Sequence, residues 1–168
     1  MEPKVSIIMG STSDMDVMAK AAQLLDEFEI PFEMNALSAH RTPEAVEEFS
    51  KGALSRGLKV IIAGAGMAAH LPGVIAAMTP LPVIGVPINA GMSGFDSLLA
   101  IAQMPPGIPV ATVAVNGAMN AAILAVQIMA TGDPALMEKM RNYKENLKQK
   151  IVQANRELSE VKYTYKTN

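Results

Sequence analysis

Short apolar runs alternate with amphipathic stretches from residue 4 to about residue 130. Runs of β-branched and apolar residues predict strands that are buried on both faces. Apolar residues spaced three and four apart predict helices; the first such set includes Met18, Ala21 and Leu25. The pattern predicts strands at 4–9, 31–37, 59–64, 81–87 and 108–115, and helices at 14–28, 43–56, 71–78, 93–103 and 117–130.

Buried strands that alternate with helices indicate a parallel sheet covered on both sides. We therefore expect an α/β fold, a three-layer doubly wound parallel sheet of the flavodoxin-like kind with a long C-terminal helix. The length of 168 residues fits a single domain. Within it we distinguish an α/β catalytic domain at 1–132 and a helical extension at 133–168.

The extension begins with strong helix-start signals. Gly132 suits a helix end, Asp133 an N-cap and Pro134 a first helical position. Apolar residues then recur at steps of three and four from Leu136 to Leu158, with Lys, Arg and Glu between them. This pattern predicts a helix of about 40 Å with one narrow apolar seam. We expect it to pack on neighbouring subunits.

The middle of the chain carries very little charge. Between Val60 and Leu136 the only charged residues are Asp96 and Asp133. The predicted helix at 117–130 is rich in alanine, which allows neighbouring elements to approach closely. Either subunit interfaces or packing within one core explains this composition, and a homo-oligomer is our expectation.

Composition excludes several classes of protein. The chain has no cysteine, which excludes disulfides, thiol nucleophiles and cysteine-based metal sites. A net charge of −2 offers no basic stripe for nucleic acid. The first ten residues lack the pattern of a secretory signal, so a cytoplasmic location is expected. The apolar window 60–78 is interrupted by glycines, His70 and Pro72, which argues against a membrane span.

In a doubly wound sheet, ligands bind at the carboxyl ends of the strands. Four predicted loops lie there, and both histidines of the chain, His40 and His70, fall within them; the loops are 10–14, 38–43, 64–70 and 89–96. We expect the ligand to bind among these loops.

The first loop combines Gly10, three hydroxyls that include Ser11 and Ser13, and the start of a helix, which together suit an anion. The alternative is that Ser13 caps the helix, with Asp16 three residues on, and Asp14 is a solvated acid of its first turn. A carboxylate beside an anion site fits a ribose diol better than a phosphate.

The second loop, with the sequence SAHRTP, holds Arg41, whose planar guanidinium can grip a phosphate, after Ser38. His40 is the natural proton-transfer group at neutral pH, although a surface loop histidine is the commoner occurrence. Thr42 and Pro43 are predicted to be the N-cap and the first residue of the next helix.

The third loop places Gly64, Gly66 and Ala69 at the spacing of a dinucleotide fingerprint. That fingerprint requires an acid about 20 residues later, and no acid occurs between Glu48 and Asp96, so we reject NAD binding. No cluster of metal ligands is visible. No lysine lies in the central loops for Schiff-base chemistry. The residues describe an enzyme without a cofactor or metal that acts on a phosphorylated ribose compound, with one histidine moving protons.

Six stretches together resemble the class I N5-carboxyaminoimidazole ribonucleotide mutases, the catalytic subunit of bacterial phosphoribosylaminoimidazole carboxylase. They occur in the family's order over about residues 5 to 130; they are MGSTSD, SAHRTP, AGAGMAAHLPG, PVIGVP, GFDSLLAIAQMPPGIPVATVAV and NAAILAVQI. The tail after Asp133 matches only in character.

The resemblance implies an isomerase of purine biosynthesis that shifts a carboxyl group from nitrogen to carbon 4 of aminoimidazole ribonucleotide through carbon dioxide. It implies a homo-octamer and a transient contact with the ATP-dependent synthetase that supplies the substrate. His40 would be the general acid and base. The other implied site residues hold the phosphate and nearby polar atoms, the ribose hydroxyls or the carboxylate; they are Ser11, Ser13, Asp14, Ser38, Arg41, Gly66 and His70.

Two departures from the family pattern occur. Met67 stands where the family usually has glycine, and the segment around 87–98 is one residue shorter than usual. Two other functions stay open: direct carboxylation of aminoimidazole ribonucleotide by carbon dioxide, and a flavodoxin-like nucleotide-binding module. Arg41 and the third loop favour the mutase.

Overall fold

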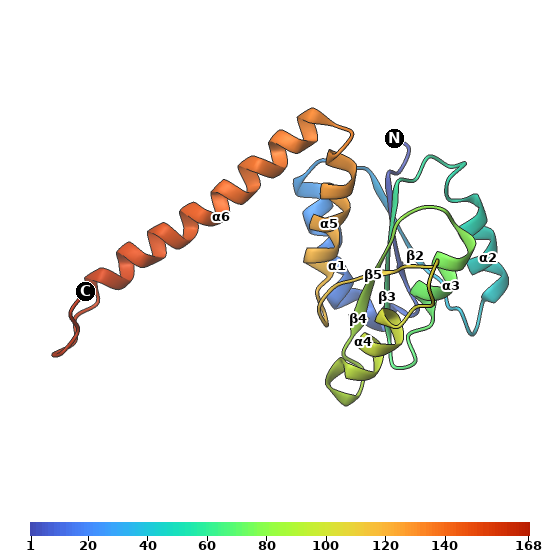
Figure 1. Ribbon diagram of the computed structural model, residues 1–168, viewed down its shortest axis with the longest axis horizontal. Helices are drawn as coiled ribbons and strands as arrows, with labels where there is room; N and C mark the ends of the chain where they lie inside the picture. The colour runs from blue at the N-terminus through green and yellow to red at the C-terminus, as the bar shows by residue number, and fades with distance from the viewer. The chain divides into compact units, whose positions relative to one another are not determined.

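The computed structural model describes residues 1–168 and divides into two compact units, Met1–Met129 and Ala130–Asn168. The first unit contains a five-stranded parallel sheet in the order β2-β1-β3-β4-β5 (Figure 1). The strands are β1 (Val5–Met9), β2 (Phe32–Ala36), β3 (Val60–Gly66), β4 (Val83–Ile88) and β5 (Ala111–Thr112). The helices are α1 (Met15–Glu27), α2 (Pro43–Gly52), α3 (Leu71–Met78), α4 (Phe95–Ala102) and α5 (Ala118–Ala130), with short 3-10 turns η1 (Thr12–Asp14) and η2 (Met92–Gly94).

The helices cover both faces of the sheet, which confirms the three-layer, doubly wound, flavodoxin-like fold. Figure 1 shows α1 and α5 on one side of the strands and α2 and α3 on the other. On the second side, Val46 of α2, Ile75 of α3 and Ile101 of α4 are fully buried against the sheet. The strand order changes direction between the neighbours β1 and β3, and a ligand site is expected at the carboxyl ends of these two strands.

The last predicted strand is much shorter than expected. Only Ala111 and Thr112 form a regular ladder with β4, although single hydrogen bonds continue from Val113 N–H to Gly85 O (3.1 Å) and from Asn116 N–H to Pro87 O (2.8 Å). Pro109 has no N–H to donate, and Asn116 has a left-handed φ of 57°. These two residues therefore limit the ladder at its ends.

Two predicted helices also have different bounds. The helix predicted at 43–56 ends at Gly52, and the one predicted at 93–103 begins at Phe95. Ser93 (φ 56°) and Gly94 (φ 82°) have left-handed backbone conformations, which cannot belong to a right-handed helix. On α5, the predicted alanine-rich helix, the alanines at 118, 121, 122 and 125 are fully buried in the structure, so packing within one core accounts for that face.

The second unit is dominated by α6 (Pro134–Glu160). The Asp133 carboxylate caps it as predicted, because its Oδ1 accepts hydrogen bonds from the N–H groups of Ala135 and Leu136, each at 3.0 Å. Large apolar side chains of the predicted seam, Leu147, Ile151 and Leu158, are exposed. Their packing on a neighbouring subunit stays a prediction. No helix of the chain has the length and apolar character needed to span a bilayer.

Candidate active site

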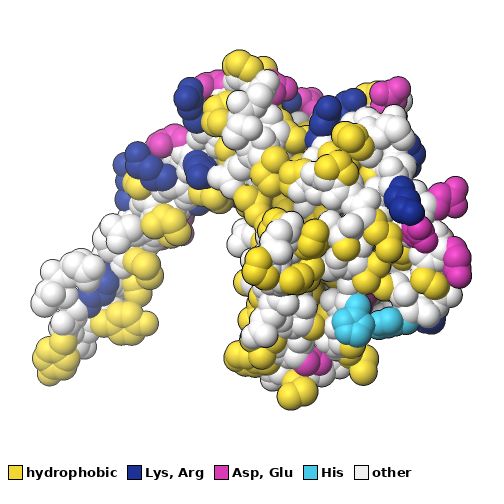
Figure 2. Space-filling view, turned by 45° about the vertical axis from the view of Figure 1, so that its right-hand side comes forward, with side chains coloured by type: hydrophobic (Ala, Val, Ile, Leu, Met, Phe, Trp, Pro, Cys, Tyr) yellow, Lys and Arg dark blue, Asp and Glu magenta, His cyan; other side chains and the backbone are white.

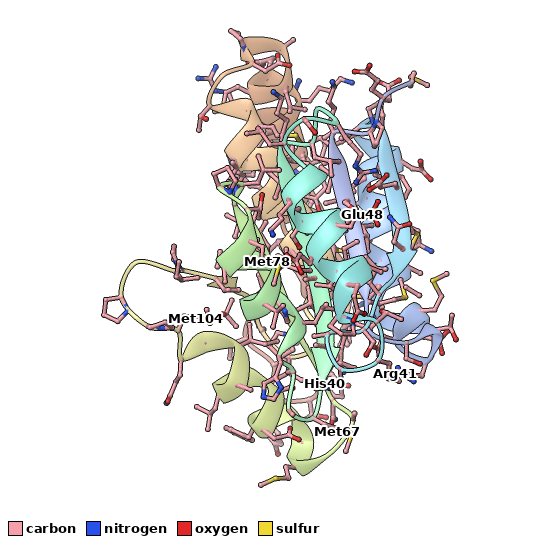
Figure 3. The ribbon with its side chains drawn as sticks, turned by 90° about the vertical axis from the view of Figure 1, so that its right-hand side faces the viewer. His40, Arg41, Glu48, Met67, Met78 and Met104 are labelled. Atoms are coloured by element: carbon pink, nitrogen blue, oxygen red, sulfur yellow. The ribbon has the colours of Figure 1, made fainter.

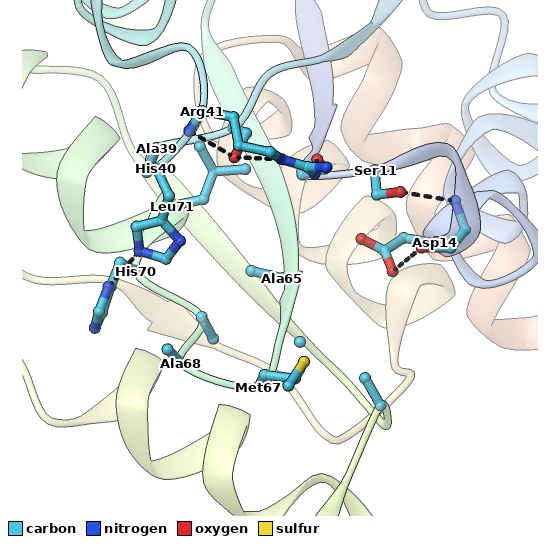
Figure 4. Close-up of a pocket in the computed structure, with 16 residues that line it drawn as sticks. Ser11, Asp14, Ala39, His40, Arg41, Ala65, Met67, Ala68, His70 and Leu71 are labelled. Carbon is cyan, nitrogen blue, oxygen red and sulfur yellow. Dashed lines mark hydrogen bonds between the residues drawn. The ribbon is translucent and has the colours of Figure 1, made fainter.

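A cavity of about 450 Å³ opens in the first unit where the loops after β1, β2 and β3 meet (Figure 4). The cavity lies at the carboxyl ends of the strands, beside the point between β1 and β3 where the strand order reverses. Ligands bind at this position in doubly wound folds. All eight residues predicted from the sequence line this one cavity: Ser11, Ser13, Asp14, Ser38, His40, Arg41, Gly66 and His70. The structure thus brings together side chains that lie up to 59 positions apart (70 − 11 = 59).

In the first loop Ser13 caps no helix, which corrects the sequence-based prediction: Ser11 is the N-cap of the turn η1, and Asp14, without a capping side-chain hydrogen bond, is the N-cap of α1. The Ser11 Oγ accepts a hydrogen bond from the Ser13 N–H at 3.3 Å and so begins the turn η1 ahead of α1. The prediction was wrong because this extra turn moves the start of helical structure back by two residues. The Ser13 Oγ instead donates to Oδ1 of Asp14 at 3.5 Å.

Asp14 lines the cavity from the end of this turn. Partial burial raises the pKa of its carboxyl group above the ordinary value of 3.8, because desolvation disfavours the charged form. The hydrogen bond from Ser13 acts in the opposite direction and stabilises the carboxylate. Asp14 therefore supplies an acceptor that is incompletely solvated before any ligand binds.

The second loop is stiffened by contacts between Ser38 and Thr42. The Thr42 Oγ1 accepts from the Ser38 N–H at 3.0 Å and donates to the Ser38 carbonyl at 3.2 Å. Thr42 does occupy the N-cap position and Pro43 the first helical position of α2, as predicted. Its side chain, however, makes no capping hydrogen bond, because its hydroxyl is committed to Ser38 instead.

Arg41 connects the first two loops. Its Nη2 donates to the Gly10 carbonyl at 2.7 Å and its Nε to the Ser38 Oγ at 3.4 Å, and its backbone N–H also donates to that Oγ at 3.2 Å. Figure 4 shows the side chain extending toward Ser11 and Asp14. These contacts leave further N–H groups of the guanidinium for a ligand.

The two histidines form a pair at the other side of the cavity. Nε2 of His40, from the loop before α2, lies 2.6 Å from Nδ1 of His70, which directly precedes α3. The rings are edge to face, with centroids 4.8 Å apart and planes at 89°. Both side chains are exposed, and Figure 2 shows the histidines together, in cyan, at the molecular surface.

The third loop closes tightly around its glycine. A Cβ on Gly66 would lie 2.9 Å from the Cβ of Ala90, so only glycine allows this approach. Gly64, the first glycine of this loop, has a different role from Gly66. It does not line the cavity; a Cβ there would lie 2.5 Å from Sδ of Met18, so this glycine accommodates α1.

The fourth predicted loop contributes only Ala90 to the cavity. Residues 92–96 form η2 and the start of α4, so three loops rather than four supply most of the site. Sequence reasoning did not name Ala39, Leu71 and Ala90 among the site residues, although they line the cavity. Alanine and leucine carry no chemical signal, and only their positions after strands or at the start of a helix point to them.

The switch-point cavity and its serine, arginine and histidine lining define a doubly wound α/β protein with a polar site large enough for a small ligand. The chain belongs to the AIR carboxylase family, which it matches over residues 4–150. It is 58% identical over 147 residues to the N5-carboxyaminoimidazole ribonucleotide mutase of Pyrococcus abyssi, covering 87% of this chain and 84% of that protein.

A second curated relative and a solved structure are also similar to this chain. The N5-carboxyaminoimidazole ribonucleotide mutase of Pyrococcus horikoshii is 54% identical, covering 95% of this chain and 91% of that protein. The crystal structure of a Treponema denticola PurE2 variant has 31% sequence identity and a TM-score of 0.85, covering 94% of this chain and 99% of that one.

Proposed function

We propose that this protein is an N5-carboxyaminoimidazole ribonucleotide mutase of purine biosynthesis, an isomerase that moves a carboxyl group from the exocyclic nitrogen to carbon 4 of the imidazole. The observation that carries the proposal is the 58% identity over 147 residues with a relative of that name. The family match over residues 4–150 includes every residue that lines the cavity. Of the two other functions considered from the sequence, neither has a specific observation in its favour.

The reaction requires one proton to be added to the exocyclic nitrogen and one proton to be removed from carbon 4. The carbamate N–C bond breaks, its electron pair stays on nitrogen, and the nitrogen takes up a proton as carbon dioxide leaves. Carbon 4 then forms a bond to carbon dioxide and gives up its own proton. His40 is proposed to carry this proton, because an imidazole can donate and accept at neutral pH. No cofactor or metal is part of the proposal.

The remaining lining residues are proposed to hold the substrate. Arg41 and the hydroxyls of Ser11, Ser13 and Ser38 would bind the phosphate, since the guanidinium retains free N–H groups beside these serines. Asp14 would accept hydrogen bonds from the ribose hydroxyls, which suits a carboxylate that is already partly desolvated.

His70 and the narrow third loop at Gly66 would enclose the migrating carboxyl group. Enclosure favours recapture of carbon dioxide over its loss to water, because it keeps the reacting carbons close together.

We also propose that the extension at 133–168 packs on neighbouring subunits in a cytoplasmic homo-oligomer, an octamer. A transient contact with the synthetase would deliver the substrate.

Offering each substrate separately tests the function. Purified protein should convert N5-carboxyaminoimidazole ribonucleotide to the 4-carboxy product without added bicarbonate. It should turn over aminoimidazole ribonucleotide plus bicarbonate far more slowly. Turnover of the second mixture alone would mean that the protein is a direct carboxylase. The absence of both reactions, together with a flavin retained through purification, would support the nucleotide-binding module.

A further inference from the structure

Met67 has a backbone conformation that is rare for a residue with a long side chain. Its φ of 55° lies in the left-handed region, where a Cβ crowds the backbone and which glycine reaches freely. The loop around it is held on both sides. The Ala69 N–H donates to the Gly66 carbonyl at 3.0 Å, and Gly66 lies directly against Ala90. These contacts maintain the conformation that Met67 adopts.

The Met67 side chain lies at the mouth of the cavity. It lines the cavity but is 64% exposed, so it is not anchored in the core of this chain. Figure 4 shows it across the cavity from Arg41, with its sulfur directed toward the enclosed space, and Figure 3 shows Met67 at the same edge of the sheet as His40. Core packing therefore does not explain a long apolar side chain here.

The lining has no second side chain of this kind. The neighbouring residues of the same wall are small: Ala65, Gly66, Ala68 and Ala69. Leu71 is the other long apolar residue of the lining, but it is only 3% exposed and packs in the core. A methionine has three rotatable bonds and a polarisable sulfur, so it can adapt to whatever occupies the cavity.

We propose that Met67 strengthens commitment in the mutase reaction: its side chain covers the reacting edge of the bound imidazole and adds to the narrow third loop in retaining carbon dioxide until carbon 4 captures it. This inference rests on the proposed function. Between cleavage of the N–C bond and formation of the C–C bond, carbon dioxide is uncharged and not covalently attached. An apolar cover suits such an intermediate and also excludes the water that would hydrate it to bicarbonate.

The test follows the carboxyl carbon. N5-carboxyaminoimidazole ribonucleotide labelled with 13C in its carboxyl group is converted in excess unlabelled bicarbonate, and mass spectrometry measures the label in the 4-carboxy product. An enzyme-free sample corrects for spontaneous loss. Wild type should retain most of the label. Met67→Gly and Met67→Ala should each lose at least several-fold more of it, and Met67→Leu should remain close to wild type.

Met92 provides a matched control. It is also left-handed, with a φ of 46°, and is 78% exposed, but it does not line the cavity. Met92→Gly should therefore relax the backbone in the same way and leave label retention at the wild-type level. Melting temperatures should show that Met67→Gly folds at least as stably as wild type, since glycine accepts this φ without crowding.

The possible outcomes separate the two proposals. Wild-type retention in both Met67→Gly and Met67→Ala would overturn the role of Met67 and leave the mutase assignment intact. Loss of label in Met67→Gly alone would also overturn it, because backbone stiffness rather than the side chain would then retain carbon dioxide. If wild type itself formed no labelled product, the proposed function would fail.

Discussion

Nε2 of His40 lies 2.6 Å from Nδ1 of His70, and this hydrogen bond joins the loop after β2 to the start of α3. One ring must donate and the other must accept, because two N–H groups facing each other would repel. The contact therefore couples the tautomers of the two rings and orients the imidazole of His40 within the cavity.

Replacing His40 should lower kcat much more than replacing His70. His40→Asn should lower kcat by about 10²- to 10⁴-fold, the usual contribution of a general acid and base. His70→Phe should lower kcat by about fivefold through loss of an orienting hydrogen bond worth about 1 kcal/mol. Steady-state kinetics measure both, with melting temperatures to show that the fold is retained. An equally large loss in both variants would show that His70 takes part in the proton transfer itself.

Arg41→Lys should weaken substrate binding although it keeps the positive charge. A lysine ammonium cannot span the Gly10 carbonyl, the Ser38 hydroxyl and a phosphate at once, as a planar fork can. We expect KM to rise by about tenfold with a smaller change in kcat. Arg141→Lys, an exposed position on α6, is the control and should change neither constant. A fall in kcat at unchanged KM would place Arg41 in the chemical step instead.

The elements of the fold followed from the sequence because hydrophobic pattern depends on local spacing, and the sheet order obeys general rules for parallel strands. The fifth strand did not follow, since pairing at its ends depends on Pro109 and on the left-handed Asn116. Asn116 Oδ1 also accepts from the Asn89 N–H at 3.0 Å, a contact between residues 27 positions apart. Such contacts are invisible to any local pattern.

For the site, chemically distinctive residues could be predicted and geometry could not. Ser, Asp, His and Arg at strand ends indicated the three loops that form the cavity. The sequence did not indicate that Ser11 would cap the first turn, or that Gly64 would face Met18 rather than the cavity. Both outcomes depend on where neighbouring side chains lie in space.

Asp14→Asn should separate stability from function. Burial raises the folded-state pKa of this carboxyl above 3.8, so its negative charge opposes folding at any pH above that value. Far below pH 3.8 the carboxyl is protonated in both the folded and the unfolded state, and this effect is absent. At pH 7 the Asn variant should therefore melt at the same temperature as wild type or slightly higher, and any difference should vanish as the pH falls toward 3.8. Its KM should rise if Asp14 binds the ribose. Thermal melts across pH and steady-state kinetics test the two halves; a variant that melts lower than wild type at pH 7 would contradict the first.

Glu33→Gln should destabilise the protein in a way that depends on pH. The Arg56 guanidinium grips both carboxylate oxygens, at 2.7 and 3.0 Å, and Ser6 donates to one of them at 3.0 Å. Hydrogen bonding to Arg56 is the main cause that lowers the pKa of Glu33 below 4.5. The resulting stability is present above pH 4.5 and is lost as the pH falls through the lowered folded-state pKa.

The expected loss in Glu33→Gln is about 1 kcal/mol at pH 7, since the pair is partly exposed. Urea unfolding at pH 7 and again below the lowered pKa should show this difference and then its disappearance. Glu47→Gln is the matched control: Glu47 is another glutamate with a basic partner, Lys51, but both side chains are exposed on α2 and their pair should contribute little. Equal effects of the two substitutions would mean that Arg56 and Ser6 add nothing to an ordinary surface charge pair.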